Sequence, residues 1–109
     1  MTDSYTPKPG YSYFCPCGQL FLTLLVPLTT LPERQLDHTF VVDESLPHIA
    51  HFLTGTRYYI IRYDGGYEQR IALLCRRCSV ECAYALQTAP GYLYLNPTLF
   101  EERTVTVSV

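Results

Sequence analysis

Four of the five cysteines in this 109-residue chain form two close pairs, Cys15-Pro-Cys17 and Cys75-Arg-Arg-Cys78. Paired thiolates are typical ligands of a structural zinc ion, which takes four of them in a tetrahedron. In extended backbone, side chains two residues apart share a face, so both sulfurs of the first pair can reach one ion. We predict one structural Zn²⁺ per chain, held by Cys15, Cys17, Cys75 and Cys78.

Such an ion would join distant parts of the chain, because 57 residues lie between Cys17 and Cys75. Closing a loop of that length stabilises the folded state. The remaining cysteine, Cys82, lies inside an expected strand, where core packing is the simplest interpretation and a role as substitute ligand stays open. A redox role for Cys75 and Cys78 is a minor alternative, since the strand-then-helix context of a thioredoxin-like motif is missing.

Catalytic chemistry finds little support in the sequence. His38, His48 and His51 stand apart from any cysteine or carboxylate motif of recognisable spacing, and exposed or capping roles suit them better. Four thiolates leave a zinc ion no open position for water. The chain also lacks a phosphate-binding glycine loop and a nucleophile elbow. We therefore predict that the protein is not an enzyme.

Charge and hydropathy exclude two classes of partner. The formal net charge is −2, with only eight Lys and Arg residues, so we expect no direct nucleic-acid binding. No apolar run approaches the roughly 18–20 residues of a membrane span, and no signal peptide is apparent, so we expect no membrane insertion. Paired cysteines that act as metal ligands are typical of reducing compartments, which predicts the nucleus or the cytoplasm.

The elements that must position the cysteines read as strands. The fold class expected is all-β, with mainly antiparallel hairpins and at most one short helix. Runs rich in aromatic and β-branched residues, bounded by Gly, Pro or Asp, predict strands over residues 11–15, 19–26, 39–43, 56–63, 67–74, 80–86, 92–95 and 104–107. Two hairpins would then present the cysteine pairs at their ends, with Asp64-Gly65-Gly66 as a further hairpin turn.

Other segments are expected to be less regular. Residues 27–38 read as a loop with two prolines, and residues 44–53 as a helical turn capped by Asp43 or Ser45, with Pro47 in its first turn. The chain divides into a flexible lead-in over 1–10, a zinc-bound β domain over 11–97, and a segment over 98–109 that forms an edge strand or a tail.

Four tyrosines surround the Asp64-Gly65-Gly66 turn: Tyr58, Tyr59, Tyr63 and Tyr67. Alternation directs some of them outward, where tyrosines can anchor a protein interface. Ordinary cross-strand pairing is the simpler interpretation of each.

Several of these residues resemble the STING ER exit protein family. The run from Tyr13 to Gln19 (Tyr-Phe-Cys-Pro-Cys-Gly-Gln) and the later Leu31-Pro32 are similar to the opening of that family. Further similarities follow at Val42-Asp43, Arg62, Gly66, Glu68 and the Cys-x-x-Cys pair that begins at Cys75. Two departures stand out: Ser79 replaces a usual glycine, and the family's long, charged C-terminal coiled-coil region is absent.

The resemblance implies a protein-interaction adaptor. Family members are linked to pre-mRNA splicing in the nucleus and to endoplasmic-reticulum (ER) exit of a membrane cargo through coat-protein vesicles. Our preferred interpretation is a spliceosome-associated module with spliceosomal protein partners, and the alternative is an ER-exit adaptor with coat or trafficking partners. A zinc or thiol redox enzyme ranks last. By analogy, hairpins that meet at a zinc ion also resemble β-tent domains.

Overall fold

The computed structural model describes residues 8–96 and 101–107. Within them lie nine strands and one 3₁₀ turn, η1 (Leu28–Thr30), arranged as two antiparallel sheets. The strands are β1 (Lys8–Phe14), β2 (Leu20–Leu24), β3 (Phe40–Asp43), β4 (His48–Ala50), β5 (Leu53–Ile61), β6 (Tyr67–Leu74), β7 (Glu81–Leu86), β8 (Ala89–Leu95) and β9 (Glu101–Val107). Every strand expected from the sequence has a counterpart, and the all-β, antiparallel fold class is confirmed.

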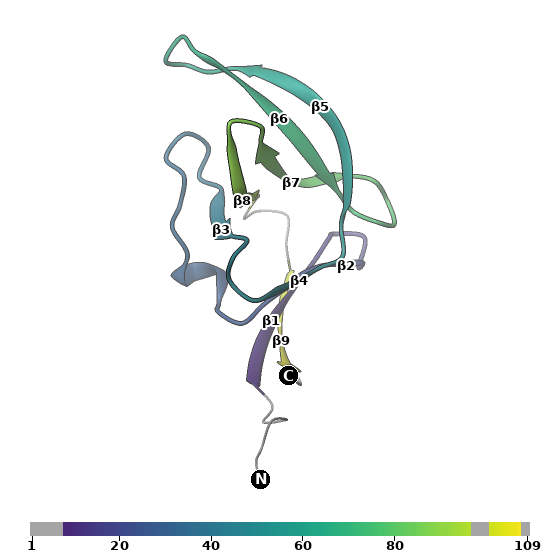
Figure 1. Cartoon of the computed structure of the whole chain (residues 1–109). Helices are drawn as coiled ribbons and strands as arrows, with labels where there is room; N and C mark the ends of the chain where they lie inside the picture. Colours follow the sequence, from purple (N-terminus) through teal and green to yellow (C-terminus); the bar gives the residue numbers. More distant parts are fainter. Residues whose placement is uncertain (1–7, 97–100, 108–109) are drawn as a thin grey trace.

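The first sheet has the order β4-β2-β1-β9. β1 and β2 form a hairpin that pairs Tyr11 with Leu24, and β9 returns from the far end of the chain to pair with β1. In Figure 1 this sheet lies at the lower end of the molecule. The first cysteine pair is therefore delivered by the turn that joins two central strands.

The second sheet has the order β3-β8-β7-β6-β5. Its long β5–β6 hairpin rises at the opposite end of the molecule (Figure 1). The hairpin turn uses the residues expected, with Gly65 at φ +91° and the Asp64 carboxylate accepting the Gly66 amide at 3.1 Å. A φ in that range favours glycine, because a side chain would meet its own backbone.

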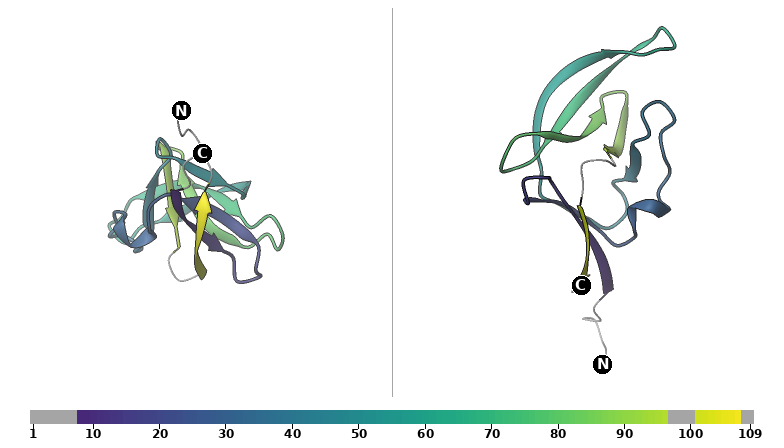
Figure 2. Two further views of the ribbon diagram at one scale, coloured as in Figure 1. Left: turned by 90° about the horizontal axis from the view of Figure 1, so that it is seen from below. Right: turned by 180° about the vertical axis from the view of Figure 1, so that it is seen from behind.

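The hydrophobic core joins the two sheets, which meet in the middle of the molecule when seen from behind (Figure 2). Buried side chains of both sheets pack into one cluster. It includes Tyr13, Phe21, Leu22 and Leu24 from the first sheet and Val42, Leu73, Ala83, Leu93 and Leu95 from the second. Because β1 and β6 both border this core, the turns that follow them are brought together.

The prediction of a helical turn over residues 44–53 is wrong. Asp43 does accept hydrogen bonds from the backbone and hydroxyl of Ser45, at 2.9 and 2.8 Å, but these close a tight turn rather than begin a helix. The chain then extends as β4, whose Ile49 lies opposite Thr23 of β2. Pairing with the sheet edge satisfies backbone groups that a single helical turn would leave free.

The predicted division of the chain stays a prediction. Most of the lead-in over 1–10 and the boundary at 97/98 lie outside the described residues. The strands that are described, from Lys8 to Val107, all belong to the two sheets.

Candidate metal centre

The first cysteine turn joins β1 to β2. The Cys15 amide donates to the Gln19 carbonyl at 2.9 Å, and the Gly18 amide donates back to the Cys15 carbonyl at 2.8 Å. Gly18 has φ +93°, which only glycine adopts without strain. The turn thereby places the side chains of Cys15 and Cys17 on the side that faces the second sheet.

The second cysteine turn repeats this pattern between β6 and β7. The Cys75 amide donates to the Val80 carbonyl at 2.9 Å, and the Ser79 amide donates to the Cys75 carbonyl at 3.0 Å. Ser79 has φ +65° and so occupies the left-handed position that Gly18 fills in the first turn. The Arg77 amide also points at the Cys75 sulfur, at 3.4 Å.

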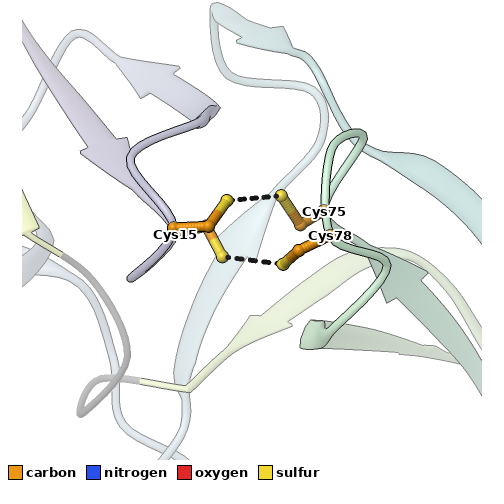
Figure 3. Close-up of side chains that lie close together, drawn as sticks. Cys15, Cys75 and Cys78 are labelled. Carbon is orange, nitrogen blue, oxygen red and sulfur yellow. Dashed lines mark hydrogen bonds between the residues drawn. The ribbon is translucent and has the colours of Figure 1, made fainter.

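The two turns bring four sulfurs together. Cys15 Sγ lies 3.5 Å from Cys78 Sγ, Cys17 Sγ lies 3.5 Å from Cys75 Sγ, and all four lie within 4.8 Å of one another. In Figure 3, Cys15 lies opposite Cys75 and Cys78, and a dashed line joins its sulfur to that of Cys78. Tetrahedral Zn–S bonds of about 2.3 Å require sulfurs about 3.8 Å apart. The group could therefore hold a metal ion.

Burial and backbone amides act differently on the thiols of Cys15 and Cys75. Burial raises the pKa of the Cys15 thiol far above its ordinary value of 9. At Cys75 burial also opposes ionisation, but the amides of Cys78 and Arg77 outweigh it and lower the pKa to about 6. The second turn is thus built to stabilise a thiolate, which is the form that binds a cation.

Cys82 lies beside this group without joining it. Its side chain is fully buried in the core, and its thiol approaches the Val80 carbonyl at 3.8 Å. Burial raises the pKa of this thiol to about 11, so it stays protonated at neutral pH. The position matches the expectation of core packing.

The histidines are not near the cysteines in any metal-binding arrangement. Exposed His38 contacts the Glu33 carboxylate at 2.7 Å, and His48 contacts the Leu46 carbonyl at 2.8 Å. The predicted helical face shared by His48 and His51 does not exist, because β4 occupies that segment. Among the described residues, the four cysteines are the one group of cysteine, histidine and acidic side chains close enough to hold an ion.

A buried charge network on the second sheet was not anticipated from the sequence. Glu68 is only 7% exposed and accepts two hydrogen bonds from Arg34, at 2.7 and 2.9 Å, and one from Arg70 at 2.7 Å. Arg70 also lies 3.9 Å from the centre of the Tyr84 ring, whose hydroxyl donates to Asp37. The network fastens the loop between η1 and β3 onto the sheet. Its members come from distant segments, so no local pattern could have revealed it.

Arg62 and Gly66 extend this network toward the β5–β6 turn. The Arg62 guanidinium lies 3.8 Å from Glu68 and bonds the Asp64 carboxylate at 3.1 Å. A Cβ atom at Gly66 would fall 2.4 Å from Arg62 Nη2, so the glycine leaves room for the guanidinium. Arg62 therefore contacts both Gly66 and Glu68, the two residues that stand beside it in the family-like pattern of the sequence.

Comparison with known proteins identifies the family. The sequence profile described as the STEEP1 domain matches residues 4–105. A curated protein of Schizosaccharomyces pombe named "ER exit protein" is 73% identical over 100 residues, which cover 92% of this chain and 87% of that protein. The chain belongs to the STING ER exit protein family.

Membership in the STING ER exit protein family gives the family-like residues a structural reason. Tyr13, ahead of the first cysteine pair, accepts the Leu28 amide at 2.7 Å and donates to Glu102 at 2.8 Å. Its hydroxyl therefore ties together β1, η1 and β9. The glycine usual in the family after the second pair corresponds to Ser79, whose positive φ explains that preference.

In the described part of the chain, no helix is both long and apolar enough to span a membrane.

Proposed function

We propose that this chain is a zinc-stabilised adaptor that promotes the exit of a membrane cargo protein from the ER by binding other proteins. The observation that carries the proposal is the 73% identity to a protein named "ER exit protein". The aligned region makes up 87% of that relative, so the shared domain accounts for most of a protein that bears this name.

Zinc is the metal that suits the site best. Two of the sulfur–sulfur distances are 3.5 Å, and all four sulfurs lie within 4.8 Å of one another. Soft thiolate donors suit zinc rather than calcium or magnesium. Cys15, Cys17, Cys75 and Cys78 would fill every position of the ion. We therefore assign the metal a structural role and propose no catalysis for the protein.

The metal would act by holding the two sheets in one arrangement. Cys15 and Cys17 belong to the first sheet's hairpin, whereas Cys75 and Cys78 follow the longest hairpin of the second. A bound ion crosslinks the sheets next to their shared core and so fixes the surfaces that partners would meet. Cysteines stay reduced and free to bind a metal in the cytosol, which suits work on the cytoplasmic face of the ER.

Pre-mRNA splicing, the interpretation preferred from the sequence, receives no support from the comparisons. The name of the similar fission-yeast protein concerns ER exit, and it favours the alternative. Spliceosomal partners are therefore not part of the proposal, which retains protein partners of the trafficking class.

Replacing one ligand tests the metal centre. Purified Cys75→Ser protein should lose its zinc, while the wild type carries one zinc ion per chain by mass spectrometry of the metal. Cys82→Ala is the matched control, since Cys82 is also buried but lies outside the sulfur group, and it should keep its zinc. A zinc-free wild type that folds normally would contradict the assignment.

A vesicle-budding experiment tests the ER-exit function. Microsomes from fission yeast lacking the relative would be incubated with coat proteins, with and without this chain, and the membrane proteins in the budded vesicles quantified. We expect the wild-type chain, but not Cys75→Ser, to restore packaging of a subset of membrane proteins. Vesicle contents that do not change when the chain is added would contradict the ER-exit function. If the chain also corrected intron retention in the same yeast strain, splicing would be favoured instead.

A further inference from the structure

The two sheets end in four edge strands, and three of these edges are protected against pairing with another chain. β4 has three residues and β3 has four, and β3 is also bridged by Glu33 opposite Phe40. β9 carries Glu101, Glu102 and Arg103, which are all exposed. Short length, coverage and charge are the usual means by which proteins prevent a free edge from recruiting a further strand.

The fourth edge, β5, is neither short nor bridged by another segment of the described chain, and its one charged residue is Arg57. It runs for nine residues, holds no Pro, Lys, Asp or Glu, and lies outermost in the sheet (Figure 1). An irregular register between Thr54 and Arg57 interrupts its lower end, but residues 57–61 pair regularly with β6. Tyr59 is 67% exposed and Ile61 is 85% exposed. A long apolar edge of this kind is a hazard unless a partner uses it.

The hydrogen-bond pattern shows which residues face outward. The Arg62 amide donates to the Gly66 carbonyl at the end of the hairpin. Main-chain groups alternate in direction along an antiparallel strand, so Ile60 and Tyr58 also bond toward β6. The amides and carbonyls of Ile61, Tyr59 and Arg57 therefore point to the free edge. The side chains of these same three residues are exposed on one face of the sheet.

We propose that β5 binds an extended segment of a partner protein as an added antiparallel strand. The segment would carry apolar side chains opposite Ile61 and Tyr59 and a carboxylate opposite Arg57. Arg57 is exposed and forms no ion pair within the described residues, so a carboxylate there would gain a partner without breaking an existing contact. The inference rests on the proposed adaptor function and names the surface through which it would act.

An acidic partner fits this edge better than a second copy of the chain. β5 contains a guanidinium and no carboxylate, so pairing with itself would leave Arg57 without an opposite charge. Strand addition can also be distinguished from docking on a general apolar surface. Such a surface would include the exposed Tyr67 of β6, whose ring contacts that of Tyr59 edge-on, with the ring centres 6.0 Å apart. Strand addition instead depends on the outward amides of β5.

Direct binding of a designed peptide tests the proposal. The probe is a fluorescein-labelled peptide of sequence Gly-Val-Thr-Val-Thr-Glu-Gly, which places valines and a glutamate on one face. Fluorescence anisotropy with the full chain should show saturable binding with a Kd on the order of 0.1 mM, as suits a short added strand. Two changes to the probe should each weaken binding about tenfold or more. One replaces its glutamate by lysine, and the other methylates those backbone amides of the peptide that would face β5.

Matched variants locate the binding to the edge. Ile61→Pro removes one outward amide without touching the ladder to β6, and should weaken binding about tenfold more than Ile61→Thr, which keeps that amide. Arg57→Glu should prefer the lysine probe. Tyr67→Lys should bind normally. Zinc content and thermal unfolding verify that each variant folds.

Several results would overturn the inference. Equal binding by Ile61→Pro and Ile61→Thr would exclude strand addition, and no binding of either probe by the folded wild type would exclude this ligand class. A wild-type dimer in sedimentation that Ile61→Pro dissociates would assign the edge to a second copy. None of these results affects the vesicle-budding experiment, so the adaptor function and the β5 site can fail separately.

Discussion

Neutralising Glu68 should destabilise the fold far more than neutralising any exposed carboxylate. Glu68→Gln keeps the shape of the side chain but removes its charge, so that Arg34 and Arg70 keep only Asp37, at 4.0 and 3.3 Å, as a carboxylate partner among the described residues. Their side chains are only 18% and 11% exposed, so water cannot replace the lost partner well. Breaking a buried ion pair on one side leaves an uncompensated charge in the interior.

The size of the effect follows from the acidity of this carboxyl. Hydrogen bonds from Arg34, followed by those from Arg70, outweigh burial and lower the pKa of Glu68 from 4.5 to about 2. A tenfold change in proton affinity is worth about 1.4 kcal/mol, so ionisation of Glu68 contributes about 3 kcal/mol to the folded state at pH 7. The side chain is 5% exposed, so solvent screening reduces this value little.

Urea unfolding, followed by circular dichroism, measures the effect. Glu68→Gln should lower the free energy of unfolding by about 3 kcal/mol at pH 7, a large part of the roughly 5–15 kcal/mol typical of a domain. Because the folded pKa is depressed, the advantage of wild type is complete above pH 4.5 and declines as pH falls toward 2. The difference between the two proteins should be about 2.5 kcal/mol at pH 4 and about 1.5 kcal/mol at pH 3.

A surface carboxylate provides the control. Glu101 pairs with Arg103 at 2.9 Å, but their side chains are 65% and 59% exposed. Glu101→Gln should lower the free energy of unfolding by less than about 0.5 kcal/mol. A loss below about 1 kcal/mol for Glu68→Gln, or a difference from wild type that stays constant from pH 7 to pH 3, would refute the reasoning.

Three further substitutions probe local geometry through urea unfolding. Ser79→Gly should stabilise the protein by about 1 kcal/mol, since φ +65° strains serine, and Ser79→Val should destabilise it; the opposite order would contradict the role of this position. Gly66→Ala should lower the free energy of unfolding by about 1 kcal/mol, because the added Cβ displaces the Arg62 guanidinium. The loss should be smaller in an Arg62→Ala background, and losses that simply add would exclude that contact. Tyr13→Phe should cost about 1–3 kcal/mol because it leaves the buried Leu28 amide without an acceptor, and a neutral result would show that another group replaces the hydroxyl.

Local patterns in the sequence were sufficient to predict most of the fold. Strand positions follow from runs such as residues 56–63, and the Asp64-Gly65-Gly66 turn follows from residues that tolerate positive φ. The segment over 44–53 shows where such patterns fail. Asp43 and Pro47 are compatible with a helix start, but the free edge of β2 decided its conformation. Tertiary pairing overrides weak local propensity when it satisfies more backbone groups.

The candidate metal centre divides in the same way between sequence and tertiary structure. The sequence by itself determined which four cysteines are paired, because a turn needs its residues to be neighbours in the chain. Only the tertiary structure brought the pairs within 4.8 Å, assembled Glu68 with arginines up to 34 residues away, and left the outer edge of β5 unpaired among the described strands. Those features depend on how the two sheets pack, and the contacts that decide packing join residues whose separation in the sequence carries no local signal.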